Sequence, residues 1–266
     1  MKRWIQRAAA SSVLLGLPAQ AVALPAIQAR GEAALWPVVQ QAAERYMQHT
    51  PGATVTVVRG NTLFAMKSLL QGSADIAMVQ GNIPGDIRQE IQVRQLKLRH
   101  VVIDYQRMTP VVHPSNPLNS IRLDHLQAVF AGSIDNWRML GGRAGPIVLL
   151  VESPAQGLGQ AWKEAMVGES GRLARYARMV SAQDKLALLT KHVNGISFVL
   201  HDQLSPAVKA LQVTQIGTEP HTSTSVRDTL RMPISLWVEE PASPTVNDFI
   251  QRVPRGPIAL QPGVRP

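Results

Sequence analysis

The chain has no cysteine, few aromatic residues and no long apolar run. Of its 266 residues, 5% are aromatic and none is cysteine. The lack of thiols excludes disulfides, thiolate metal sites, cysteine redox chemistry and a lipid anchor on a cysteine. No segment reaches the roughly 20 consecutive apolar residues that a membrane-spanning helix needs. We therefore expect a globular protein whose chemistry does not depend on thiols.

The first 23 residues are typical of an export signal. Lys2, Arg3 and Arg7 form a basic start, a short apolar core covers residues 8–17, and Ala21-Val22-Ala23 supplies a small-x-small cleavage site. The alternative is a buried N-terminal helix. We expect a signal peptide over residues 1–23 and an unlipidated mature protein of about 240 residues in the bacterial periplasm.

Acidic residues are also in short supply. The chain has 27 Lys and Arg against 18 Asp and Glu, a formal net charge of +9, and loss of the three basic residues of the signal leaves +6. The basic residues are scattered, without a long block or a nucleic-acid-binding motif, which argues against a nucleic-acid partner. Two interpretations stay open: a positive field that attracts a small anion, or a basic surface without a specific partner.

The most informative stretch is residues 123–146. Apolar residues at three- and four-residue spacing predict a helix from Leu123 to Phe130, Gly132 ends it, and a loop leads to a strand over Ile147–Val151. The string resembles the "LxxIFxGxIxNWxxxGG" segment of the phosphate-binding subunits of bacterial uptake transporters, a branch of the type II periplasmic binding proteins. The match is carried by Leu126, Phe130, Gly132, Ile134, Asn136, Trp137, Gly141 and Gly142.

Two weaker matches lie in register with this segment. Gln71–Ala77 resembles the "xGxxDIA" strand entry of type II binding proteins, and residues 194–199 resemble the family's "NPGAIGYV" stretch. With gaps, the resemblance runs from about residue 27 to residue 253. Its ligand loops have diverged from the family pattern.

The order of elements near the N-terminus is strand, helix, strand, helix, strand, which predicts parallel pairing with right-handed crossovers. The resemblance implies an α/β, two-lobed type II periplasmic-binding-protein fold, with a mixed sheet in each lobe flanked by helices and two crossing strands. We expect lobe 1 at 24–107, lobe 2 at 108–231 and a return to lobe 1 at 232–253. The proline-rich residues 254–266 are predicted to be a disordered tail.

Three strand-to-helix turns are candidates for ligand loops: Arg30–Ala34, Arg59–Thr62 and Glu152–Gln160. In such a fold, ligands bind at the carboxyl ends of strands, where helix N-termini offer N–H groups to an anion. The predicted ligand-binding residues are Arg30, Gly31, Arg59, Gly60, Asn61, Thr62, Gly157, Gly159 and Gln160.

These loops depart from the family pattern. Relatives carry Ser or Thr where this chain has Glu32 and Ala33, and an arginine with Gly-Ser-Gly-Thr where this chain has Gly157-Leu158-Gly159-Gln160. A carboxylate at position 32 would repel a dianion or occupy its position as an internal helix cap. Arg30 and Arg59 could compensate by holding an oxyanion, or could pair with Glu32 instead.

No pattern indicates an enzyme. The seven histidines are dispersed, and the sequence has no metal-spaced pair, nucleophile elbow, P-loop or carboxylate pair placed for acid–base work. We therefore predict no catalytic residue, no metal and no cofactor.

Two hypotheses follow for the function. The first is a periplasmic solute-binding protein that captures a small oxyanion, phosphate or similar, in an inter-lobe cleft, in the service of an ABC transporter. The second is a periplasmic sensor or adaptor that keeps the fold, no longer binds phosphate and acts through protein contacts. The expected partners are the small anion and, beyond it, an inner-membrane ABC permease or a sensor kinase.

Overall fold

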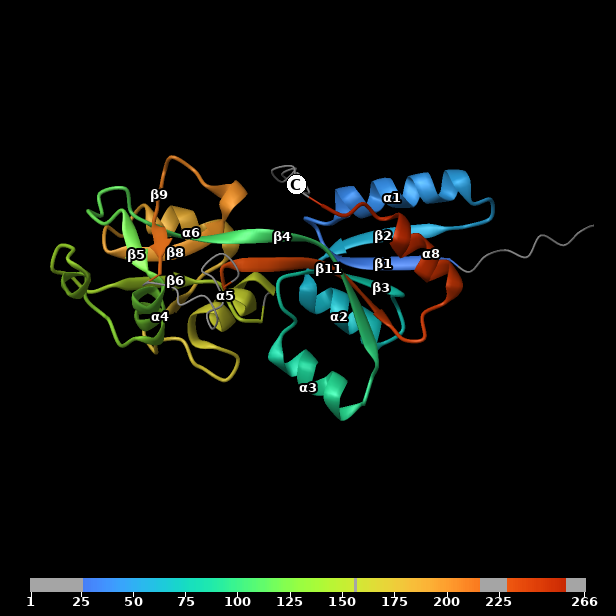
Figure 1. Ribbon diagram of the computed structural model, residues 1–266, viewed down its shortest axis with the longest axis horizontal. Helices are drawn as coiled ribbons and strands as arrows, with labels where there is room; N and C mark the ends of the chain where they lie inside the picture. The colour runs from blue at the N-terminus through green and yellow to red at the C-terminus, as the bar shows by residue number, and fades with distance from the viewer. Residues whose placement is uncertain (1–25, 156, 216–228, 257–266) are drawn as a thin grey trace, which may run out of the picture.

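The computed structural model describes residues 26–155, 157–215 and 229–256. They form two lobes that lie side by side and are joined by two long strands (Figure 1). The expected signal peptide lies outside the described residues, as does the predicted tail from residue 257 onward. Within the described part of the chain, no helix combines the length and the apolar character needed to cross a membrane.

Lobe 1 is built from strands that alternate with helices. Its elements are β1 (Ile27–Glu32), α1 (Trp36–His49), β2 (Val55–Gly60), α2 (Thr62–Leu70), β3 (Ile76–Gln80), α3 (Gly85–Val93) and, from the far end of the chain, α8 (Pro244–Arg252). β1 pairs in parallel with both β2 and β3, as the sequence predicts. α1 and α8 cover one face of the sheet, and α2 and α3 cover the other (Figure 1).

The two-residue alternation of β1 decides which side chains face which helices. Ile27 and Ala29 are buried in the core beneath α1 and α8. Gln28, Arg30 and Glu32 therefore point to the other face, toward α2. The last side chain of β1 thus lies beside the start of α2.

Two strands run through both lobes, β4 (Leu98–Val112) and β11 (Arg231–Glu239). β11 pairs antiparallel with residues 98–107 of β4. β11 also pairs with β3 in lobe 1, and β4 pairs with β8 in lobe 2. The strand order is β2-β1-β3-β11-β4-β8-β6-β7, with β9 beside β4. The predicted mixed sheets and the two crossing strands are confirmed. The predicted lobe boundaries fall within β4 and β11 and stay predictions.

Lobe 2 surrounds a second core. Its elements are β5 (Ser120–Arg122), α4 (Leu123–Ala131), η1 (Trp137–Leu140), β6 (Val148–Val151), α5 (Gly157–Val167), β7 (Arg178–Met179), α6 (Ala182–Leu189), β8 (Gly195–Leu200), η2 (His201–Gln203), β9 (Lys209–Ala210) and β10 (Gln212–Thr214). Trp162 of α5 stacks on Phe198 of β8 with ring centroids 4.3 Å apart, and Phe130 meets Trp162 edge-on at 5.2 Å.

The stretch that carries the family resemblance serves this core. Gly132 ends α4 with a φ of +88°, and Asn136 caps η1 by accepting a hydrogen bond from the Arg138 amide. Trp137 is buried and donates from Nε1 to the Asn194 carbonyl at 2.9 Å. The motif therefore identifies a scaffold and contributes no group to the cleft described below.

Candidate functional site

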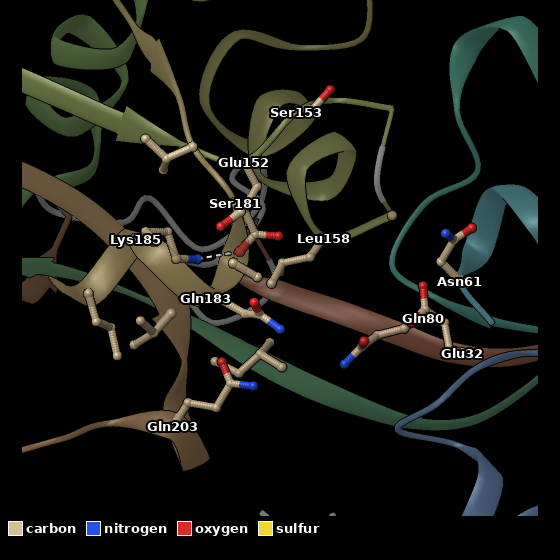
Figure 2. Close-up of a pocket in the computed structure, with 16 residues that line it drawn as sticks. Glu32, Asn61, Gln80, Glu152, Ser153, Leu158, Ser181, Gln183, Lys185 and Gln203 are labelled. Atoms are coloured by element: carbon tan, nitrogen blue, oxygen red, sulfur yellow. Dashed lines mark hydrogen bonds and ion pairs between the residues drawn. The ribbon is translucent and has the colours of Figure 1, made fainter. Parts of the chain in front are cut away.

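A cleft of about 630 Å³ lies between the two lobes (Figure 2). Glu32, Asn61 and Gln80 line it from lobe 1. From lobe 2 it is lined by Glu152, Ser153, Gly157, Leu158, Val180, Ser181, Ala182, Gln183, Lys185, Leu186, Val199, Leu200 and Gln203.

The fold places this cleft where strands end and helices begin. β1 and β3 end at Glu32 and Gln80, and β6 ends directly before Glu152. The carboxyl ends of strands in an open α/β sheet form the crevice in which ligands bind. The three turns that the sequence singled out each contribute to the same cleft, through Glu32, Asn61 and Gly157.

The lobes are in contact at Gly157, the first residue of α5. A Cβ atom at this position would lie 2.0 Å from the Gln80 carbonyl oxygen and 2.7 Å from Thr62 Oγ1. Only glycine fits such an approach without a shift of the backbone. Gly157 thus allows the start of α5, in lobe 2, to rest against the end of β3 in lobe 1.

Glu32 binds the N-terminus of α2. The Thr62 backbone amide and the Thr62 hydroxyl both donate to Glu32 Oε1 at 2.7 Å. Asn61 is the N-cap residue and accepts from the Phe64 amide through Oδ1 at 2.9 Å. Burial raises the pKa of Glu32, and the two Thr62 hydrogen bonds oppose this rise. Of the two roles that the sequence allowed for this carboxylate, the internal cap is the one that the structure shows.

The structure does not bring Arg30 or Arg59 to the cleft. Arg30 donates from Nη1 to Ser73 Oγ at 3.5 Å, and Arg59 is exposed with its guanidinium 3.9 Å above the Trp36 ring. Within residues 26–155, 157–215 and 229–256, neither arginine forms an ion pair with Glu32. The compensating anion contact expected of these arginines thus has no geometric support.

The remaining predicted ligand residues have mixed positions. Gly31 has a φ of +142° and a Cβ there would lie 2.2 Å from the Met78 carbonyl, while one at Gly60 would meet the Phe64 ring at 2.3 Å. A Cβ at Gly159 would meet the Ser153 carbonyl at 2.2 Å. These three glycines serve close packing. Of the predicted set, Asn61 and Gly157 line the cleft.

Thr62 and Gln160 are both buried and bound to other groups of the chain. Thr62 Oγ1 contacts Glu32 and the Gln80 carbonyl. Gln160 donates from Nε2 to Glu164 at 2.6 Å. Neither side chain reaches the cleft surface.

The pair Glu152–Lys185 is the main feature of the cleft that sequence reasoning missed. Their side chains form an ion pair, and the two residues are only 6% and 3% exposed. Lys185 Nζ also lies 4.3 Å from the Phe198 ring centroid. Burial lowers the pKa of Lys185, and the charge of Glu152 opposes the fall. The position of Glu152 directly after a buried strand was a usable signal, whereas Lys185 resembled any other helical lysine.

A second group of polar side chains joins the lobes beside the cleft, and we call it the Glu164 cluster. Glu164 of α5 accepts hydrogen bonds from Asn82, from Arg88 Nη2 at 2.5 Å and from Gln160. Asn82 and Arg88 belong to lobe 1, and Glu164 belongs to lobe 2. Arg88 and Glu164 are 26% and 16% exposed in their side chains, so their ion pair is partly shielded from water.

Residues 18–250 match the family model of the PBP superfamily domain. The chain belongs to the PBP superfamily. Its residues are 27% identical to phosphate-binding protein PstS of Bacillus subtilis over 127 residues, which is 48% of this chain and 41% of that protein. They are 22% identical to protein SphX of Synechococcus elongatus over 257 residues, which is 90% of this chain and 76% of that protein.

Solved structures of the superfamily share the fold. An ABC-type phosphate transport receptor from Vibrio cholerae superposes with a TM-score of 0.65 at 21% identity, covering 86% of this chain and 93% of the other. This confirms the two-lobed fold. The resemblance to phosphate-binding proteins of uptake transporters, found in the sequence, is confirmed as well. The match to the Bacillus protein spans less than half of that protein's length.

Proposed function

We propose that the protein is a solute-binding protein that captures a small solute between its lobes. The observation that carries this proposal is the convergence of three strand-to-helix turns, from both lobes, on one cleft of about 630 Å³. Cavities of roughly 300–1,000 Å³ are typical of small-molecule sites. A solute in this position would touch both lobes at once, as capture by closure requires.

The finer parts of the proposal rest on the relatives. A relative in Vibrio cholerae is described as an ABC-type phosphate transport receptor. By analogy we place this protein in the periplasm and propose that it delivers its solute to an inner-membrane ABC permease. We propose binding without catalysis, because Glu32 and Glu152 each bind a donor of the chain itself and the described lining residues include no histidine.

The relatives support the predicted oxyanion ligand, whereas the charged groups of the cleft argue against it. The names of the relatives point to phosphate. The N-terminus of α2, however, is already bound by the Glu32 carboxylate, and the one lysine among the described lining residues is paired with Glu152. A dianion at either of these two positions would meet a carboxylate that is already in place. We therefore propose solute capture and do not extend it to phosphate.

One observation favours the second candidate, a sensor or adaptor that acts through protein contacts. The Glu164 cluster and the Gly157 contact hold the lobes together through groups of the chain itself. A closed shape that needs no solute could present a constant surface to a partner protein.

A thermal-shift panel distinguishes the two candidates. The panel contains phosphate, sulfate, small carboxylates, amines, amino acids and polyols. A ligand at a thousand times its Kd stabilises the fold by about 4 kcal/mol. For a chain of this length that raises Tm by about 8–16 °C.

The variant Gln183→Trp fills the cleft from the exposed first turn of α6, and Gln92→Trp on the exposed face of α3 is its control. We expect at least one class of solute to shift the wild type and the control but not Gln183→Trp. A panel without any shift would contradict solute capture and favour the adaptor.

A further inference from the structure

The charged groups of the cleft do not balance. Its described lining residues include two carboxylates, Glu32 and Glu152, and one cation, Lys185. Lys185 is buried in its ion pair with Glu152, so these two charges cancel. Glu32 is left with the neutral donors of Thr62 and, in the described part of the chain, has no cation as a partner. An ionised Glu32 therefore gives the cleft a net negative charge.

The environment of Glu32 makes its negative charge costly in free energy. Burial is the main cause that raises its pKa, and the charge of Glu152 adds to the rise. Both effects mean that a negative charge at this position is held at a cost in free energy. A group that brings positive charge or hydrogen-bond donors to Glu32 relieves that cost, while an anion increases it.

The rest of the cleft is suited to an organic body. Leu158, Leu186 and Leu200 line the lobe 2 side, with the amide side chains of Gln183 and Gln203 beside them. Figure 2 shows Gln80 and Gln183 on opposite walls, with their amide groups directed into the space between the lobes. Inorganic phosphate, with five heavy atoms, takes up on the order of 100 Å³ if each is counted like a water. The cleft of about 630 Å³ is several times larger.

We propose that the cleft binds a small organic cation, a primary amine with a branched aliphatic body. Its ammonium group donates to the Glu32 carboxylate, and its body packs on Leu158, Leu186 and Leu200. The Glu152 charge is shared with Lys185, so Glu32 is the group that sets the preference for charge. This assignment rests on the proposed solute capture and names the chemical class of the solute.

Three probes with the same branched five-carbon skeleton test the assignment: isoamylamine, isoamyl alcohol and isovalerate, which have positive, neutral and negative ends. Inorganic phosphate is the fourth probe. Each probe is titrated into the full-length protein up to tens of millimolar. Its Kd is measured by NMR from the changes in backbone amide chemical shifts. We expect isoamylamine to bind at least tenfold more tightly than isovalerate, with the alcohol between them. This order in the wild type tests the assignment without any variant.

Glu32→Gln keeps an oxygen that can accept the Thr62 hydrogen bonds and removes the charge. We expect it to reduce the tenfold preference for the amine to less than threefold. Glu44→Gln makes the same change in net charge on the exposed face of α1 and should leave the preference intact. Equal losses in the two variants would show that only the overall charge of the protein matters and would overturn the assignment.

The outcomes separate this assignment from the proposed function. Tighter binding of isovalerate or phosphate than of the amine would overturn the cation and leave solute capture standing. The same holds if none of the four probes binds while another class in the thermal-shift panel does. If neither the four probes nor the panel gives any binding, both proposals fail.

Discussion

The hydrogen bonds between Glu32 and Thr62 give the sharpest stability prediction. Glu32→Ala removes the acceptor of two hydrogen bonds, both 2.7 Å long, from the amide and hydroxyl of a fully buried threonine. Hydrogen bonds to a charged group contribute about 1.5–3 kcal/mol each. The raised pKa of Glu32 shows that burial of the charge offsets part of this gain. We expect a net loss of about 2 kcal/mol, similar to the loss of a strong helix cap.

The companion variant, Glu32→Gln, tests the effect of the Glu32 charge alone on stability, because it keeps the side-chain oxygen. Because the pKa of Glu32 is raised above its ordinary value of 4.5, the folded state holds the proton at pH values where the unfolded state has lost it. The free energy of unfolding of the wild type therefore falls as pH rises from about 4.5 through the folded-state pKa. Each unit of difference between the two pKa values corresponds to about 1.4 kcal/mol. Glu32→Gln lacks this loss, so its stability relative to the wild type should increase over the same interval.

Urea denaturation followed by tryptophan fluorescence measures both effects, at about pH 4.5 and about pH 7.5. In a separate thermal melt at the higher pH, Glu32→Ala should lower Tm by about 4–8 °C. The reasoning is refuted if Glu32→Ala is as stable as the wild type, or if the relative stability of Glu32→Gln falls as pH rises.

Three further predictions concern other parts of the molecule. Lys185→Met leaves the buried Glu152 carboxylate without its partner and should cost about 3–5 kcal/mol in urea denaturation, whereas a cost below about 1 kcal/mol would contradict the buried ion pair. Arg88→Gln breaks the Glu164 cluster and should increase the radius of gyration measured by small-angle X-ray scattering; an unchanged value would mean that the lobes are held together elsewhere. Gly31→Ala, at a φ of +142° and facing a backbone carbonyl, should cost about 3 kcal/mol or more in thermal unfolding, and Gly52→Ala, at +84° in open space, about 1 kcal/mol. Equal costs for the two glycines would contradict the packing described for β1.

Local patterns in the sequence predicted much of the fold. Apolar spacing from Leu123 to Phe130, followed by Gly132, predicted α4 and its left-handed end, because helix period and glycine conformation are properties of the chain over a few residues. The order of strands and helices predicted the parallel pairing of β1 with β2 and β3.

The candidate site was harder to predict because its contacts join distant parts of the chain. The Glu32–Thr62 contact spans 30 residues and the Glu152–Lys185 pair spans 33. The direction of Arg59 depends on the Trp36 ring of a neighbouring helix, which no local pattern reveals. The sequence could therefore place the three turns at one cleft but could not say which of their side chains would face it.

The most direct test of the role given to Glu32 is a calorimetric titration of inorganic phosphate into the wild type, Glu32→Ala and Arg59→Ala at neutral pH. Since the Glu32 carboxylate occupies the start of α2 and Arg59 lies away from the cleft, we predict no saturable binding to the wild type or to Arg59→Ala. Removal of the carboxylate in Glu32→Ala is the one change expected to allow weak binding. Micromolar binding of phosphate to the wild type that Glu32→Ala leaves unchanged and Arg59→Ala abolishes would contradict the position assigned to both residues.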